Sequence, residues 1–499
     1  MADSLVPALR ADLSAAGFTV DGLDAAWGAD AASALFRSHR LPAVRALESR
    51  GDALAALARL FVLGLPVPRQ EADGALPTLG VEGAVGLGLV TADSETVTPA
   101  VDLRPYAFED DDGVGQWWVA SDLGELATGR AVGERHVLGI GGATTTLTSL
   151  VVPTRVGSAL DLGTGSGILA VHLARHADRV VATDLSPRAL EFAALNAALA
   201  GVDDLELRQG DLFEPVAGER FDLVVSNPPF VITPRVEGVP LYDYRDGGAV
   251  GDGIVERIVR SVGAHLTAGG VAQLLGNWEY RDGADGLDRV RGWLDGTGLD
   301  AWVIERERLD PAAYAETWIR DGGTLPGSAR FEQLYAAWLE DFADRGVSGI
   351  GFGYLTLRRP RTERMPWRRL ERLTGAVSGG LGSRIAATLA TVDRLAPLTD
   401  TAFAELRPEV APDVTERRHY WPGDEHPAAI ELVQGGGFAR EVPAGTALAA
   451  VVGACDGELT VGTIIDAVAG LLDASPAALR AELLPELREL AIDGLLGIR

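Results

Sequence analysis

Lysine is absent from this 499-residue sequence, so arginine supplies all 44 of its strongly basic side chains. Asp and Glu outnumber them at 71, which sets the formal net charge at -27 at pH 7. A chain this acidic is poorly suited to coating long nucleic acid, because phosphate contacts need clustered cationic side chains. The charge excludes that class of protein but leaves room for a local basic groove. The lack of lysine itself, beside abundant alanine and glycine, is typical of a high-GC bacterial genome.

Cysteine is almost absent too. Cys455 is the single one, and one thiol cannot form an internal disulfide, which fits a reducing cytoplasm. No histidine lies beside it, so we expect a structural role. The sequence also lacks an apolar run of about 20 residues that could span a membrane, and its first residues lack the basic and apolar regions of a secretory signal. We therefore expect a cytoplasmic protein with no membrane association, and its oligomeric state stays open.

The length exceeds what one hydrophobic core supports, which predicts several domains. We expect three: residues 1–105, 106–360 and 361–499. The outer two combine helices with short strands, a pattern that indicates winged-helix-like α+β domains. Such domains bind nucleic acid, pair subunits or cover a substrate.

The flanking segments carry helical periodicity. Leucines at spacings of three and four predict helices up to about residue 65, and a strand is expected over 97–103. Near the C-terminus, helices are expected over 459–472 and 476–494, before a short apolar end.

Between the flanks, short apolar strands alternate with amphipathic helices. This alternation predicts an α/β domain with a doubly wound, mostly parallel, Rossmann-like sheet. Ligands of such sheets bind at the carboxyl ends of the strands. The strands are expected over 159–162, 179–184, 205–209, 221–226, 271–275 and 346–357, and the helices over 167–177, 187–200 and 253–266.

A glycine-rich motif follows the first of these strands. Asp161-Leu-Gly163-Thr-Gly165-Ser-Gly167 can turn tightly and approach a ligand closely, because glycine has no side chain. Asp184 ends the next strand, where a carboxylate can accept both hydroxyls of a ribose. Together they indicate a site for an adenosine-type cofactor. By themselves they also fit a nicotinamide-dependent dehydrogenase, since Gly165, Gly167 and Ala170 satisfy the dinucleotide spacing.

A second motif separates these alternatives. The apolar strand 221–226 runs into Asn227-Pro-Pro-Phe230, whose prolines cannot continue a sheet and stiffen the backbone. The Asn227 side chain and the Pro228 carbonyl offer two fixed acceptors, which suit the two donors of a planar NH2 group. Phe230 can stack on a flat amide or base. We expect the two acceptors to localise the nitrogen lone pair toward an incoming methyl group, without a strong general base.

Residues 159–275 resemble class I S-adenosylmethionine-dependent methyltransferases, in the branch with an Asn-Pro-Pro-aromatic motif. Within it they are most similar to the HemK/PrmC family, the glutamine methyltransferases of release factors. The residues that carry the likeness are 161–167, Gln209-Gly-Asp-Leu212, Ser226-Asn-Pro-Pro229 and the stretch from Asp246 to Gly270.

The resemblance implies S-adenosylmethionine as the cofactor, methyl transfer to a planar nitrogen, and no metal. It implies that the catalytic residues are Asn227, Pro228, Pro229 and Phe230. It implies cofactor binding by Asp161, Gly163, Thr164, Gly165, Gly167, Asp184, Leu185, Asp211, Leu212 and Asn227, with Thr144 and Thr145 covering the cofactor.

The sequence departs from that family in three respects. Phe230 stands where release-factor enzymes usually carry Tyr, residues before 106 do not read as their helical substrate-binding domain, and residues after 360 have no counterpart. Methyltransferases of rRNA guanine and of adenine also use Asn-Pro-Pro-Phe. The acceptor therefore stays open between a glutamine of a release factor or ribosomal protein and a base amino group (adenine N6 or guanine N2) of RNA or DNA. A cofactor-binding regulator without catalysis is a third reading, against which the intact motif argues.

Three further segments are expected to be solvated. Gly139–Thr146 is expected to be a flexible loop, and 108–113 an acidic turn. The stretch Arg358–Arg369 is expected to be a linker or an exposed basic strip, and it is the best candidate for a nucleic-acid contact.

Two histidine pairs have spacings that deserve comparison with metal sites. His172 and His176 lie four apart on an expected helix, which is a ligand spacing, but no acidic third ligand accompanies them. His419 and His426 flank what we expect to be an exposed loop. We expect no metal at either pair.

Overall fold

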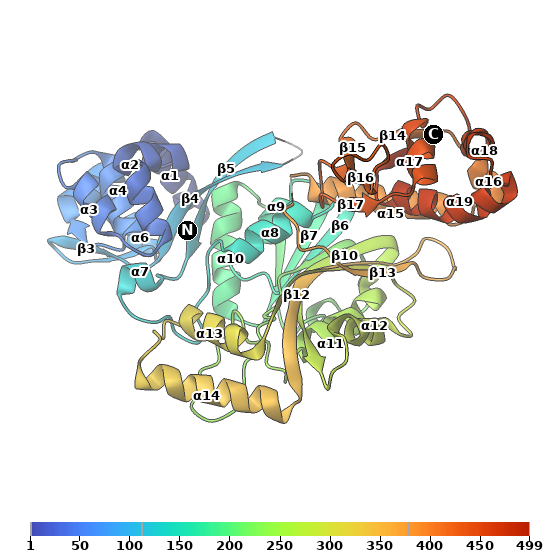
Figure 1. The fold of residues 1–499 in the computed structure, drawn as a ribbon. Helices are drawn as coiled ribbons and strands as arrows, with labels where there is room; N and C mark the ends of the chain where they lie inside the picture. Colours follow the sequence, from blue (N-terminus) through green and yellow to red (C-terminus); the bar gives the residue numbers. More distant parts are fainter. Residues whose placement is uncertain (1, 111–112, 378, 499) are drawn as a thin grey trace. The chain divides into compact units, whose positions relative to one another are not determined.

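The structure is a computed structural model that describes residues 2–110, 113–377 and 379–498. It divides into two compact units (Figure 1). The first comprises the described residues of Met1–Thr148 and Arg155–Arg372, and the second those of Ser149–Thr154 and Leu373–Arg499. No helix in the described ranges is long and apolar enough to cross a membrane.

The first unit begins with a helical layer beside a small antiparallel sheet of order β1-β3-β2. Leu9, Leu13 and Leu57 are buried in its core, as their helical spacing predicts. The helices expected up to about residue 65 are confirmed. The elements are α1 (Ala2–Ala15), α2 (Val20–Phe36), α3 (Leu41–Leu47), α4 (Ala53–Leu57), the π-helix η1 (Ala58–Val62), β1 (Val67–Pro68), α5 (Arg69–Ala75), α6 (Gly80–Gly86), β2 (Val90–Ala92) and β3 (Thr96–Pro99).

The single strand expected over 97–103 is wrong. The backbone N–H of Ala100 donates to the Leu89 carbonyl at 2.9 Å, which ends β3. A second strand, β4 (Asp102–Asp110), then forms a long hairpin with β5 (Gly113–Ser121), followed by α7 (Glu125–Thr128). Of the acidic turn expected over 108–113, residues 111 and 112 lie outside the described residues.

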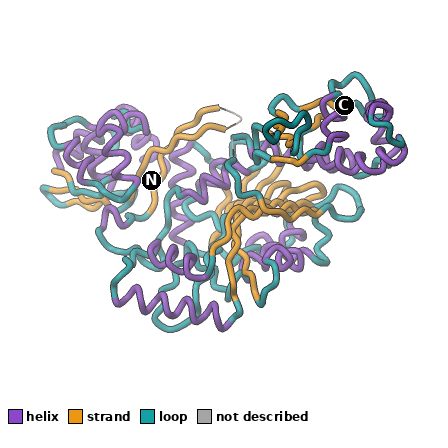
Figure 2. The backbone as a smooth tube through the Cα atoms, viewed as in Figure 1, coloured by secondary structure: helices purple, strands orange, loops and turns teal. Residues whose placement is uncertain are grey.

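Eight strands form the central sheet in the order β13-β11-β12-β10-β9-β6-β7-β8. Its strands are the orange segments gathered at the centre of Figure 2. The run from β10 to β8 is parallel, as expected for a doubly wound sheet. β12 is antiparallel to both of its neighbours, so the sheet is mixed. The strands are β6 (Val156–Leu162), β7 (Ala177–Asp184), β8 (Leu205–Gln209), β9 (Phe221–Ser226), β10 (Leu266–Arg281), β11 (Asp300–Leu309), β12 (Val347–Arg358) and β13 (Arg368–Arg372).

Helices cover both faces of this sheet. A Cβ at Gly286 of α12 would lie 2.7 Å from the Trp278 side chain, so Trp278 of β10 faces α12. The adjacent Asn277 bonds to Tyr314 of α13. Because side chains alternate along a strand, α12 and α13 lie on opposite faces. The helices are α8 (Gly142–Leu150), α9 (Ile168–Leu173), α10 (Pro187–Ala200), α11 (Gly253–Ser261), α12 (Gly286–Leu294), α13 (Pro311–Asp321) and α14 (Ala329–Asp344), with 3-10 turns η2 (Glu214–Val216) and η3 (Val262–His265).

Two expectations for loops are corrected. Residues 139–146 are not wholly a loop, because α8 begins at Gly142. The stretch 358–369 is neither a linker nor a free strip: it closes β12 and opens the eighth strand, β13. Arg358 and Arg364 both donate to the fully buried carboxylate of Asp300, at 2.8 Å and 2.6 Å. An interior carboxylate needs such partners, and it draws these arginines inward.

The second unit combines helices with two small sheets, β14-β18 and β15-β16-β17. Cys455 is buried there and its thiol donates to the Val451 carbonyl at 3.1 Å. Burial raises the pKa of this thiol to about 12, which suits a structural side chain. The elements are α15 (Leu381–Leu395), α16 (Asp400–Ala404), β14 (Pro408–Val410), β15 (Val414–His419), β16 (Ala429–Gln434), β17 (Glu441–Pro443), α17 (Thr446–Gly453), α18 (Val461–Leu471), α19 (Pro476–Ile492) and β18 (Leu496–Ile498).

Candidate functional site

The glycine-rich motif forms the turn between β6 and α9. Gly163, Gly165 and Gly167 have φ of 75°, 56° and 84°, a region that side-chain-bearing residues rarely adopt. A Cβ at Gly167 would lie 2.7 Å from Cα of Ala193 in α10. The turn therefore requires glycine both for its backbone and for its packing.

Asp161 stands behind this turn, fully buried. Its Oδ2 accepts from the Thr164 hydroxyl at 2.6 Å and from the Ala170 N–H at 3.0 Å. Burial raises the pKa of Asp161 to about 7. Its Oδ1 has no hydrogen-bond partner among the described residues. Asp161 and Thr164 thus brace the turn from inside.

Asp184 ends β7 and joins the same turn. Its Oδ2 accepts the N–H of Gly165 at 2.8 Å, and its Oδ1 accepts the N–H of Ser186 at 2.8 Å. Burial raises the pKa of Asp184. The next residue, Leu185, is exposed. The structure thereby brings the first and second predicted binding elements together.

Asp211 and Leu212 follow β8, the next strand at that edge. Leu212 has φ of 46°, a left-handed backbone that is uncommon for a leucine. The Asp211 carboxylate accepts from Arg257 of α11 at 2.8 Å. Backbone strain of this kind concentrates at functional sites.

The Asn-Pro-Pro-Phe turn begins where β9 ends. Ser226 donates its hydroxyl to the Leu162 carbonyl at 2.7 Å, which places the turn beside the end of β6. Oδ1 of Asn227 is buried and has no partner among the described residues, and within them the Pro228 carbonyl accepts no hydrogen bond. Two acceptors at the carboxyl edge of the sheet are therefore unpaired.

Phe230 is largely enclosed, with 9% of its surface exposed. Its ring centroid lies 5.5 Å from that of Phe352 on β12. The carbonyl of the preceding Pro229 accepts the Gly247 N–H at 3.0 Å. These contacts fix the turn against β12 and against the loop that returns to α11.

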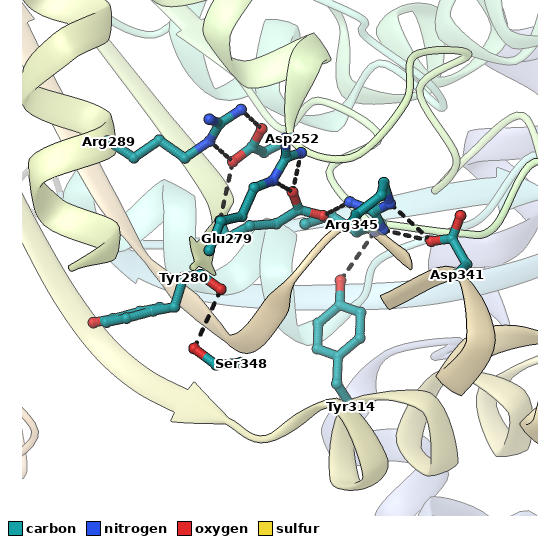
Figure 3. Close-up of polar contacts among 10 residues, drawn as sticks. Asp252, Glu279, Tyr280, Arg289, Tyr314, Asp341, Arg345 and Ser348 are labelled. Atoms are coloured by element: carbon teal, nitrogen blue, oxygen red, sulfur yellow. Dashed lines mark hydrogen bonds and ion pairs between the residues drawn. The ribbon is translucent and has the colours of Figure 1, made fainter. Parts of the chain in front are cut away.

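That returning loop ends in a buried ionic network that sequence reasoning missed (Figure 3). Asp252 accepts from Nε and Nη2 of Arg289 at 2.6 Å and 2.7 Å, and from the Glu279 N–H at 3.0 Å. The fully buried carboxylate of Glu279 pairs with Arg281 and Arg345. Figure 3 shows the Glu279 side chain between Asp252 and Arg345. The network holds the loop end in one place.

Thr144 and Thr145 lie in the first turn of α8. Thr145 is exposed and donates its hydroxyl to the Gly141 carbonyl at 3.3 Å. No hydrogen bond among the described residues joins either threonine side chain to the turn 163–167.

One histidine of each pair contacts neighbouring side chains. His172 lies in an aromatic cluster, with its ring 4.6 Å from Phe108 and 4.7 Å from Trp117. Burial lowers the pKa of His172 to about 3, so it is neutral at physiological pH. His419 contacts Glu431 at 3.1 Å, and His426 is exposed. Within the described ranges no three metal-ligating side chains gather.

Three features define a class I S-adenosylmethionine-dependent methyltransferase domain. They are the glycine turn after β6, the acidic residue that ends β7 and the Asn-Pro-Pro-Phe turn after β9. Comparison with known proteins agrees. Residues 139–281 match the family model "Methyltransferase small domain", and residues 15–100 match a "Domain of unknown function (DUF7059)". The methyltransferase region of this chain is homologous to the HemK/PrmC-like glutamine methyltransferases.

Three relatives illustrate the likeness. The ribosomal protein uL3 glutamine methyltransferase of Bradyrhizobium diazoefficiens is 41% identical over 128 residues, which are 24% of this chain and 40% of that protein. The release factor glutamine methyltransferase of Xylella fastidiosa is 51% identical over 73 residues, 14% and 26% of the two chains. That of Geobacter sulfurreducens is 41% identical over 123 residues, 23% and 43%. The chain thus matches less than half the length of these relatives.

Proposed function

We propose that this protein transfers a methyl group from S-adenosylmethionine to the side-chain amide nitrogen of a protein glutamine. The observation that carries the proposal is the pair of unpaired acceptors, Asn227 Oδ1 and the Pro228 carbonyl, at the carboxyl edge of the sheet beside the glycine turn. A buried polar group without a partner costs about 1–3 kcal/mol, so its retention calls for a ligand.

The glycine turn and its neighbours fit the cofactor. We assign Gly163, Thr164, Gly165 and Gly167 to its methionine end, where backbone approach is closest, and Asp161 to bracing that turn. Asp184 keeps free lone pairs for the two ribose hydroxyls beside the exposed Leu185. The left-handed Leu212 and its neighbour Asp211 are assigned to the adenine. Thr144 and Thr145 are assigned to covering the site from α8.

The cofactor supplies an activated methyl group on its sulfonium sulfur. Asn227 and Pro228 accept the two N–H bonds of the target amide and fix the plane of its nitrogen. As the methyl–sulfur bond breaks and the methyl–nitrogen bond forms, the nitrogen loses one of these two protons past its acceptor to solvent, so the product is a neutral N-methyl amide. Amide nitrogen is a weak nucleophile because its lone pair is delocalised, and the two acceptors favour the geometry in which the pair points along the transfer direction. Pro229 stiffens the turn. Phe230, packed on Phe352, closes the side of the site that would otherwise admit water.

A protein acceptor fits this chain better than a nucleic acid. The arginine stretch that favoured nucleic acid is engaged internally, because Arg358 and Arg364 hold Asp300 and Arg368 donates to Asp295 at 3.0 Å. The relatives named above act on release factors or on uL3, and we propose an acceptor of that kind, modified in the cytoplasm. We further propose that residues 1–105 and 361–499 form winged-helix-like domains and that residues 106–360 form the methyltransferase domain.

The test is a methylation assay with purified release factor and purified uL3 from the source organism. We expect one glutamine of one of them to gain the mass of one methylene, mapped by tandem mass spectrometry. Asn227→Ala should abolish the signal while binding of S-adenosylmethionine, measured by calorimetry, persists. Methylation of ribosomal RNA in place of protein would refute the proposal and support the base amino group as the acceptor.

A further inference from the structure

A second amide side chain faces the same turn from the neighbouring strand. Leu274 of β10 pairs with Ser226, the last residue of β9, so the continuation of β10 to Asn277 runs alongside the Asn-Pro-Pro-Phe turn. Asn277 is 1% exposed. It pairs across the sheet with Phe352, and paired residues of antiparallel strands share one face. Since Phe352 also contacts the Phe230 ring, Asn277 and Phe230 are both neighbours of Phe352.

Hydrogen bonds connect Asn277 to the segment that leaves the turn as well. As the amide is placed, Nδ2 of Asn277 donates to the Tyr314 hydroxyl at 2.6 Å, and the same hydroxyl accepts the Ile232 N–H at 3.0 Å. Oδ1 of Asn277 is then buried and unpaired among the described residues. One end of the Asn277 amide therefore holds the segment after the turn through Tyr314, and the other end has no partner in the described part of the chain.

The hydroxyl of Tyr314 indicates which group is unpaired. An asparagine amide can be rotated by 180° without change of shape, so the hydrogen-bond balance decides its orientation. With nitrogen toward Tyr314, the hydroxyl would accept twice and its proton would have no acceptor in the described part of the chain. With oxygen toward Tyr314, the hydroxyl donates to it and the NH2 of Asn277 is the sole unmet group. The second orientation leaves fewer polar groups unsatisfied.

We infer that Asn277 determines specificity by donating an N–H to the carbonyl oxygen of the target carboxamide. This inference rests on the proposed function. Asn227 and Pro228 bind the NH2 half of the carboxamide with acceptors, and Asn277 binds its C=O half with a donor. A carboxamide, which carries an NH2 group and a carbonyl oxygen on one carbon, fits this combination of two acceptors and one donor. The unpaired ends of the Asn227 and Asn277 side chains are both enclosed. The target carboxamide therefore reaches them when a side chain that covers them moves aside.

The experiment uses the full-length protein with the release factor and uL3 as acceptors. Asn277→Asp keeps the shape and the acceptor for Tyr314 but removes the N–H donor at neutral pH. We expect kcat/KM for the protein acceptor to fall roughly 10- to 100-fold, the range for an unpaired buried group. The affinity for S-adenosylmethionine should stay within about twofold, because the residue contacts the acceptor side.

A pH profile separates donation from a merely structural role. A protonated aspartic acid again donates an O–H, so the activity of Asn277→Asp relative to wild type should rise as the pH falls from 8 to 6. Burial raises the pKa of a carboxyl placed at this position, which is 1% exposed. Glu279 and Asp246, which raise the pKa of the neighbouring Tyr314, act in the same direction, and Arg345, paired with Glu279, acts against them. Asn277→Ala, which cannot donate at any pH, should show no such rise.

Gln273→Glu is the matched control: Gln273 is a buried amide on the same strand, paired with Val225 well inside the sheet. Gln273→Glu should lower the stability of the protein, but its kcat/KM should not show the pH-dependent loss expected for Asn277→Asp. Wild-type kcat/KM in Asn277→Asp, or a loss that does not change with pH, would overturn the inference while leaving the proposed function intact. Failure of the wild-type protein to methylate any glutamine would overturn both.

Discussion

The backbone N–H of Gly165 donates to Oδ2 of Asp184 at 2.8 Å, so the glycine turn after β6 and the acidic end of β7 form one structure. A shift of β6 or of β7 would therefore change the glycine turn and the position of the Asp184 carboxylate together. This bond explains why a carboxylate at position 184 matters for the turn as well as for a ribose.

Replacement of Asp184 by Asn should weaken cofactor binding. The amide has one acceptor oxygen in place of two, so it cannot serve Gly165, Ser186 and two hydroxyls together. We expect the Kd for S-adenosylmethionine, measured by calorimetry, to rise about 10- to 100-fold, as for a lost hydrogen bond to a charged group. Asp203→Asn, at an exposed position after α10, is the control and should bind normally. Unchanged affinity in Asp184→Asn would count against the ribose assignment.

Asp161 should make the stability depend on pH. Burial raises the pKa of Asp161 to about 7 in the folded protein, from 3.8 in the unfolded chain. Between these values the folded state holds a proton that the unfolded state has lost, so this contribution to stability is complete below about pH 4 and is lost as the pH rises through 7. Asp161→Asn removes the titration. The melting temperature of Asp161→Asn, relative to that of the wild type, should rise between pH 5 and pH 8. The rise should be about 2–4 °C for each kcal/mol of stability that the wild type loses as Asp161 deprotonates. A difference that is constant over this range would contradict the account.

The buried network around Glu279 should be costly to break (Figure 3). Arg345→Met leaves the fully buried Glu279 carboxylate with Arg281 alone. We expect a loss of about 3–5 kcal/mol in the free energy of unfolding, measured with urea, because one partner of a buried ion pair is gone. Adding Glu279→Gln should restore part of it.

The matched control for this experiment is Arg320→Met. Arg320 is 58% exposed and pairs with Glu316 on α13 at 3.2 Å, so its loss should cost less than about 1 kcal/mol. Equal losses for Arg320→Met and Arg345→Met would show that the network does not stabilise the loop end.

Local sequence sufficed for the parallel half of the sheet. The strands around Ala159 and Phe221 are apolar runs bounded by glycine or proline, and such runs form buried strands whatever lies elsewhere. Pro187 began α10 at the expected residue, with Ser186 accepting the Ala189 N–H as its cap. The same local signals placed both binding motifs at strand ends.

The eighth strand and the network could not be read in this way. Four of the five residues of β13 are charged, and they join a sheet because Asp300 and Glu305, distant in sequence, bind the neighbouring arginines. Burial of such residues depends on partners that no local pattern reveals. Asn277 was missed for a related reason. Its one sequence signal was an amide within an apolar strand, and its meaning depends on the register of β10 with β9.

The most direct test of the central claim is the activity of Asn227→Ala in the glutamine-methylation assay. We predict that kcat falls about 100- to 1,000-fold, the range for removal of one preorganised hydrogen-bonding group from an active site, while the Kd for S-adenosylmethionine stays near the wild-type value. Turnover equal to that of wild type, with the same glutamine modified, would contradict the assignment of the Asn-Pro-Pro-Phe turn as the site that binds the methyl acceptor.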